Sequence, residues 1–196
     1  MKRFAQAILI ASTMLATVTL VPGCATKIAA SSSQNPAPTE AFSAFGRIDV
    51  KPAVFASGVN GNTAALSKIN QNIQLDLAQV LPEWNNARNN GRTLTIEPIV
   101  EQLSFKSGAK RAFLGPLAGS SGVLMRLQIR DDKGRVIASP QFFQRANAMA
   151  AGWAFGVHDN LMLTRVATLA SAYIRANYTT AVGGRTGGDD PALVPN

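Results

Sequence analysis

An alternation of apolar and polar side chains, followed at once by a tight-turn sequence, constrains the fold of this chain more than any other feature. Residues 123–130 alternate in this way, with Arg126 and Arg130 on the polar side. A period of two is typical of a strand that is buried on one face only. Asp-Asp-Lys-Gly at 131–134 predicts a hairpin turn, and 136–145 predicts the returning strand. This antiparallel pair needs a second layer to cover its apolar face.

Two helical patterns supply that layer. Apolar residues recur at three- and four-residue steps over 66–84, and Asn62 or Thr63 is the predicted N-cap. Pro82 is predicted to end or kink this helix. A second apolar stripe over 161–174 predicts a helix that closes the domain.

Two further strands complete the predicted sheet. The first lies over 45–55, and the second lies over 94–105, where the alternation shifts phase near Pro98. A proline with a phase shift indicates a bulge or an edge position. The predicted order is β-α-β-β-β-α. Two helices on one face of a mainly antiparallel sheet make an α+β two-layer sandwich.

The N-terminus is ordered like a secretory signal. Lys2 and Arg3 are positive, residues 4–21 carry no charge, and small Gly23 precedes Cys24, the only cysteine. This order resembles the lipobox of bacterial lipoproteins, which implies cleavage before Cys24 and a lipid on its sulfur. One alternative is a transmembrane anchor, although the apolar run is at the lower length limit for a span. The other is a free thiol, which invites unwanted pairing.

The same resemblance implies a location. In enterobacterial lipoproteins an aspartate after the cysteine favours retention in the inner membrane, whereas Ala25 stands there in this chain. The resemblance therefore implies the periplasmic face of the outer membrane. Attachment through two or more acyl chains is stable, because each buried methylene contributes about 0.8 kcal/mol.

Both ends of the remaining chain lack the apolar residues that a core requires. The segment after the cysteine is rich in Ala, Ser, Gln, Asn and Pro, and the C-terminal segment is rich in glycine. Such compositions are typical of flexible or disordered chain. The expected organisation is a signal peptide at 1–23, a lipidated cysteine and tether at 24–44, a globular domain at 45–178 and a disordered tail at 179–196.

Side chains that could carry out catalysis are few. His158 is the only histidine, in a connection ahead of the last helix, so it has no second histidine or free cysteine with which to hold a metal. A lone histidine also builds no nucleophile–base pair. The glycine-rich run at 115–122 lacks the Lys-Ser/Thr pair and the helix of a nucleotide loop. We therefore expect no enzyme activity, no metal and no cofactor.

Basic and aromatic side chains are the candidates for contact with a partner. The formal net charge is +8 at pH 7, and clustered bases could meet lipid phosphates or an acidic protein, or could simply form a solvated face. Aromatic residues in a glycine-rich apolar segment could pack on the core or face a partner or membrane. The candidate contact residues are Lys110, Arg111, Arg126, Arg130, Trp153 and Phe155.

Several motifs between 45 and 178 extend the likeness. Arg-Ala-Phe-Leu-Gly at 111–115, the small-residue run that ends at Gly122, and the turn with its return at 131–136 are among them, together with the Trp/Phe/Gly segment before the last helix. They resemble a family of bacterial lipoproteins with a domain of unknown function, which offers no catalytic residues to carry over.

The likeness and the lack of catalytic groups together predict a non-enzymatic binding or assembly module of the cell envelope. Its partners would be the membrane, through Cys24, and an envelope protein, with no nucleic acid. The alternative is a carrier of a small apolar ligand such as a lipid, which would need a cavity between helix and sheet. A hydrolase is the remote alternative.

Overall fold

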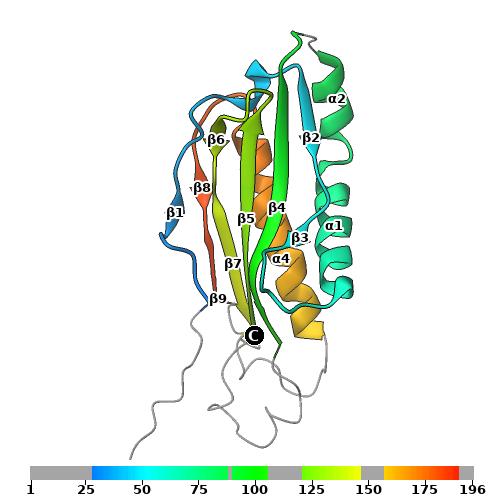
Figure 1. The fold of residues 1–196 in the computed structure, drawn as a ribbon, viewed down its shortest axis with the longest axis vertical. Helices are drawn as coiled ribbons and strands as arrows, with labels where there is room; N and C mark the ends of the chain where they lie inside the picture. The colour runs from blue at the N-terminus through cyan, green and yellow to red at the C-terminus, as the bar shows by residue number, and fades with distance from the viewer. Residues whose placement is uncertain (1–27, 88–89, 106–120, 147–156, 190–196) are drawn as a thin grey trace, which may run out of the picture.

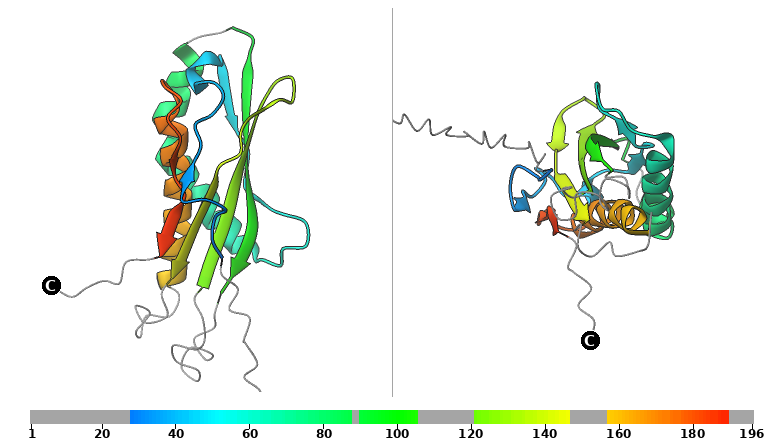
Figure 2. Two further views of the ribbon diagram at one scale, coloured as in Figure 1. Left: turned by 90° about the vertical axis from the view of Figure 1, so that its left-hand side faces the viewer. Right: turned by 90° about the horizontal axis from the view of Figure 1, so that it is seen from below.

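A sheet covered on one face by helices makes up the computed structural model, which describes residues 28–87, 90–105, 121–146 and 157–189 (Figure 1). The predicted α+β class is confirmed, and two turned views show the helices on the same side of the sheet (Figure 2). The elements are β1 (Gln34–Asn35), the 3-10 helix η1 (Phe42–Ala44), β2 (Arg47–Val50), β3 (Val54–Phe55), α1 (Thr63–Leu77), α2 (Val80–Ala87), β4 (Thr93–Ser104), β5 (Ser121–Asp131), β6 (Val136–Ala138), β7 (Gln141–Ala146), α4 (Val157–Ala176), β8 (Gly184–Arg185) and β9 (Gly187–Asp189).

The main sheet of the described chain is antiparallel at its centre and parallel toward both edges. Its strand order is β2-β4-β5-β7-β9, with β3 also beside β4 and β6 also beside β5. β5 runs antiparallel to β4, β6 and β7. In contrast, β2 and β3 run parallel to β4, and β9 runs parallel to β7. The predicted order is present, with the first and the last predicted strand each divided in two.

The strand that contains Pro98 lies inside the sheet and not at its edge. Ile96 and Val100 of β4 are both buried, so the buried face does not change at the proline. The register irregularity lies between Val100 and Gln102, a little beyond the predicted bulge. The pairing of β4 with β2 ends at Ile96, and its pairing with β3 resumes at Ile99. Pro98 lies between these two stretches, where a missing N–H removes no ladder hydrogen bond.

The first predicted helix is two successive helices. α1 begins after Asn62, whose side-chain oxygen accepts a hydrogen bond from the backbone nitrogen of Ala65 at 2.9 Å. Asn62 is therefore the N-cap. Pro82 lies in the first turn of α2, where backbone N–H groups have no partner within a helix. The proline therefore opens the second helix instead of ending the first.

The core fills the space between the helices and the sheet. Alternate residues of β5 point into it, as the sequence predicts, and α1 and α4 cover them with the apolar stripes that were predicted. The largest fully buried side chains are Phe42, Phe142, Ile69, Leu77, Leu94, Ile96, Met125, Leu127, Ile129, Met162, Ile174 and Val100. With no second cysteine, burial of this set is the main stabilising term.

The N-terminal segment belongs to the folded domain from Ile28 onward. Ile28 is buried, and a Cβ built on Gly122 of β5 would lie 3.1 Å from its side chain. The side-chain amide of Asn35 bonds to the backbone of Gln141 as a neighbouring strand would. It donates to the Gln141 carbonyl and accepts from the Gln141 nitrogen, each at 2.8 Å. The tether predicted over 24–44 is therefore wrong for residues 28–44, because their polar side chains bond to the domain.

The C-terminal segment also belongs to the domain. β9 extends the main sheet beside β7, and Thr186 just before it is buried. The backbone nitrogen of Phe143 donates to the Thr186 carbonyl at 2.8 Å. The disordered tail predicted over 179–196 is therefore wrong for residues 179–189. The prediction failed because glycines are typical of disordered chain but also permit the close approach of β9 to β7.

The two end segments are joined to each other. β1 and β8 form a separate antiparallel pair, and the Thr186 hydroxyl donates to the Ser33 carbonyl at 2.9 Å. The Tyr173 hydroxyl of α4 donates to the Pro36 carbonyl, also at 2.9 Å. Burial raises the pKa of Tyr173 to about 12, so the donor stays protonated at neutral pH. These hydrogen bonds thus join the two ends of the domain to each other and to α4.

Side-chain amides cover the outer edge of the sheet at β2 and β3. Asn85 of α2 accepts from the Ile48 nitrogen at 2.7 Å and donates to the Ile48 carbonyl at 3.1 Å. Asn70 of α1 accepts from the Ala53 nitrogen at 2.7 Å. An exposed edge with free N–H and C=O groups is a template for strand addition. The helices therefore both cover the face of the sheet and close this edge.

Candidate functional site

The two arginines of β5 that were predicted as contact residues are engaged within the domain. Arg126 forms an ion pair with Glu101 of β4, and its side chain is 36% exposed. Arg130 donates from Nη1 to the Gly134 carbonyl at 3.0 Å. Both lie on the face of the sheet opposite the helices, because the alternate positions of β5 are buried in the core. They are held in place and do not form a free basic patch.

The turn beside Arg130 has its own carboxylate. Asp131 accepts hydrogen bonds from the backbone nitrogens of Lys133 at 3.0 Å and Arg135 at 2.8 Å, and it pairs with the Arg135 guanidinium. Burial disfavours the charged form, but these hydrogen bonds outweigh it, so the pKa of Asp131 is lowered. This carboxylate is committed to the structure of the turn.

The other candidates lie outside the described residues, yet the segments that carry them join the domain at one end (Figure 1). Ser104, near the last described residue of the strand before the first segment, pairs with Gly122. Ser121 pairs with Ala146, the last described residue before the second segment. Ile28, where the description begins, packs on Gly122. The candidates outside the description are Cys24, Lys110, Arg111, Trp153 and Phe155.

Metal-binding and membrane-spanning features were sought in the described ranges. There, no three or more histidine, cysteine, aspartate and glutamate side chains are grouped so that they could hold a metal ion. Nor does any helix of those ranges combine the length and the apolar character that crossing a bilayer requires. His158 lies in the first turn of α4, which begins earlier than predicted, and not in a connection.

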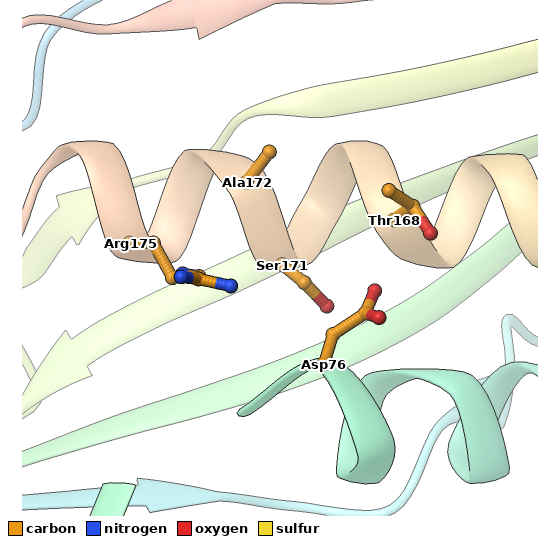
Figure 3. A pocket seen from close by; sticks show the side chains of 5 residues that line it. All are labelled: Asp76, Thr168, Ser171, Ala172 and Arg175. Carbon is orange, nitrogen blue, oxygen red and sulfur yellow. The ribbon is translucent and has the colours of Figure 1, made fainter. Parts of the chain in front are cut away.

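A pocket of about 320 Å³ lies between α1 and α4. Asp76 enters it from the last turn of α1, and Ser171 and Arg175 enter it from α4 (Figure 3). The Oδ2 atom of Asp76 and the Oγ atom of Ser171 are buried and have no hydrogen-bond partner. Such groups are uncommon in folded proteins, and each costs about 1–3 kcal/mol. The pocket is lined by Asp76, Thr168, Ser171, Ala172 and Arg175.

Sequence reasoning missed this pocket. Thr168, Ser171 and Arg175 recur at helical spacing on α4, so the chain did contain a polar stripe beside the apolar stripe. Asp76 stands between apolar residues near the end of α1 and looks like an ordinary solvent-facing position. What the sequence could not show is that the two helices lie side by side, which brings Asp76 to this stripe.

Comparisons with known proteins do not assign a family. No protein-family model matches the chain, and no curated protein matches it. Among solved structures, a dodecamer of a PelC variant from Paraburkholderia phytofirmans is 16% identical, with a TM-score of 0.39, over 70% of this chain and 93% of that one. A PelC dodecamer from the same organism is 16% identical, with a TM-score of 0.36, over 68% and 91% of the two chains. At these values the function of this chain has to be argued from its own residues.

Proposed function

We propose that this chain is a lipid-anchored protein of the cell envelope whose domain binds another envelope component without catalysing a reaction. The observation that carries the proposal is the N-terminal order of Lys2 and Arg3, an uncharged apolar run over 4–21, and Gly23 directly before the single Cys24. Acylated at Cys24, the protein would sit at the periplasmic face of the outer membrane. Its partners would be the membrane and an envelope protein.

The short distance between the cysteine and the folded domain supports a close attachment. Three residues, 25–27, separate Cys24 from Ile28. Ile28 is buried against Gly122 and is therefore fixed to the sheet. At full extension the chain from Cys24 to Ile28 spans roughly 14 Å. An acyl chain on Cys24 would hold this end of the domain next to the lipid headgroups, and not at the end of a long tether.

This attachment gives the domain an orientation. The segments 106–120 and 147–156, which contain the basic and aromatic candidates, join the domain at the end that holds Ile28. In the proposed arrangement the described residues that flank these segments, Ser104 and Ala146 among them, lie on the membrane-proximal side. Lys110 and Trp153 are of the residue types that suit such a surface, where cations meet lipid phosphate and aromatic rings meet the interface. The turn at 131–134 lies at the opposite end of the domain (Figure 1), which in this arrangement would point into the periplasm.

The anchor is tested by the mass of the mature protein. We expect intact mass spectrometry of the membrane-extracted protein to show a chain that starts at Cys24 and carries a diacylglyceryl group. Cys24→Ala should remain uncleaved and retain residues 1–23, because the modifying enzymes act on the sulfur. Thr26→Ser, two residues further on, is the control and should be processed normally. An unmodified mature chain, or a wild-type chain that starts at Met1, would overturn the anchor.

The binding role is tested by crosslinking in living cells. A photoreactive residue in place of Lys110 or Trp153 is expected to yield a defined adduct with an envelope protein, because both are candidate contact residues. Val136 of β6, 46% exposed at the other end, is the control position and should give no such adduct. Equal adducts at all three positions, or none at Lys110 and Trp153, would contradict the proposal.

The helix–sheet interface does not favour the alternative of an apolar-ligand carrier. That role needs a cavity between the two layers, but core side chains from α1, α4 and the strands occupy this space. The pocket between α1 and α4 has a carboxylate and a buried hydroxyl in its wall, which suit a polar ligand. This packing does not favour the carrier, so the binding module is the function that we propose.

A further inference from the structure

We propose that the pocket between α1 and α4 binds a primary ammonium group. The inference goes beyond the envelope role and does not depend on it, because it needs neither the lipid anchor nor the membrane-proximal end. It rests on two unpartnered oxygen atoms, on the direction of two helices and on the absence of an ion pair between two charged residues that share the pocket.

The unpartnered oxygens are the first argument. Ser171 is 1% exposed, and its Oγ has no hydrogen-bond partner within the described chain. The Oδ2 atom of Asp76, on the opposite wall, is also buried without a hydrogen-bond partner. Both side chains face the space between the helices (Figure 3). Burying such oxygens without partners is costly, so the fold carries a cost that a hydrogen-bond donor in the pocket would remove.

The charge that suits the pocket is positive. α1 and α4 run in the same direction, and the pocket lies at the C-terminal part of both (Figure 1). The C-terminus of a helix carries a partial negative charge of about half an elementary charge. The last turn of α1 contains no basic residue, and it contributes Asp76 instead. The carboxylate and the two helix ends therefore attract a cation together and disfavour an anion.

Arg175 lines the pocket but does not neutralise Asp76. It lies in the last turn of α4 and is exposed. Within the described residues it forms no ion pair with Asp76. Its guanidinium complements the end of its own helix. Arg175 is thus an exposed neighbouring charge that competes weakly for the carboxylate.

An ammonium group matches the acceptors of the pocket in number. Asp76, Ser171 and Thr168 each present an oxygen to it, and an ammonium has three N–H donors and no acceptor. Ca²⁺ would need six to eight oxygen ligands, which one carboxylate and two hydroxyls do not supply. The source is either a free amine or the side chain of a lysine on a partner protein, and both present the same chemistry.

The test is a titration of the full chain, purified in detergent micelles, with methylammonium chloride. Tetramethylammonium chloride, which has the same charge and no N–H donor, is titrated at equal ionic strength. We expect saturable NMR shifts of the amides of Asp76 and Ser171 with methylammonium only. Nα-acetyl-lysine amide is the third probe: tighter binding than methylammonium assigns the site to a protein lysine, and equal binding assigns it to free amines.

Variants make the assignment specific. Asp76→Asn should weaken methylammonium binding about tenfold or more, because a charge-assisted hydrogen bond is lost. Asp132→Asn changes the net charge equally in the exposed turn and should leave the affinity within about twofold. Arg175→Ala should tighten binding several-fold by removing the competing cation. Identical responses to the two alkylammonium ions, or equal effects of Asp76→Asn and Asp132→Asn, would overturn the proposal.

Discussion

Gly187→Ala is expected to lower the free energy of unfolding by about 3 kcal/mol and to detach β9 from the sheet. Gly187 has a φ of 122°, a conformation that residues with a side chain rarely adopt. An added Cβ would overlap the carbonyl oxygen of Phe143 and lie 3.1 Å from the Leu169 side chain. The backbone of β7 cannot move away without losing its pairing with β5. The strand at the edge must therefore give way.

The neighbouring glycine provides a matched control. A Cβ on Gly188 would meet nothing within 4 Å, and its φ is not in the positive region. Gly188→Ala should therefore change stability by no more than about 0.5 kcal/mol. Urea unfolding gives the two free energies, and hydrogen exchange at the Phe143 amide, which donates to Thr186, reports the detachment of β9. Two small and equal effects would mean that this segment is not paired with β7.

The elements of the domain that have an apolar face could be predicted from the sequence, and the two end segments could not. Hydrophobic periodicity predicted the α+β class, a strand over 123–130 that lies within β5, and the approximate positions of both main helices, because burial of apolar side chains determines those elements. The end segments have few apolar residues, so periodicity assigned them to free chain. Asn35 and Thr186 bond to backbone groups far away in the chain, and Asn177 bonds to the backbone on both sides of the turn after α4. No local pattern indicates such a partner.

The candidate site shows the same limit in another form. A signal with a lipidated cysteine could be predicted because its residues are adjacent in the sequence, and it stays a prediction. Arg126 and Arg130 were correctly placed on a strand face, but their engagement by Glu101 and by the turn depends on pairing between strands. The pocket of Asp76 and Ser171 depends on the contact of two helices from distant parts of the chain. The partners of the two arginines and the lining of the pocket depend on contacts between distant residues, which a single sequence does not reveal.

Asn177→Leu is expected to destabilise the fold by about 3 kcal/mol, although leucine has the same number of side-chain heavy atoms and the same branching as asparagine. Asn177 follows α4 and is fully buried. Its Oδ1 accepts from the backbone nitrogens of Val182 and Gly183, each at 2.8 Å. Its Nδ2 donates to the carbonyls of Tyr173 at 2.8 Å and Gly183 at 3.0 Å. Leucine would leave these groups without partners in a buried place, and each such group costs about 1–3 kcal/mol.

Two further substitutions separate the loss of hydrogen bonds from a general effect of mutation. Asn72→Leu on α1, where the side chain makes a single hydrogen bond to the Lys68 carbonyl, should cost less than about 1 kcal/mol in urea unfolding. Asn177→Asp keeps both acceptor contacts but faces two carbonyls with a charge, which raises the pKa of the new carboxyl group in the folded state. A raised pKa means that the folded state binds a proton more tightly than the unfolded state. The stability of Asn177→Asp relative to wild type should therefore rise as the pH falls, and a pH-independent deficit would show that the amide donors do not hold this turn.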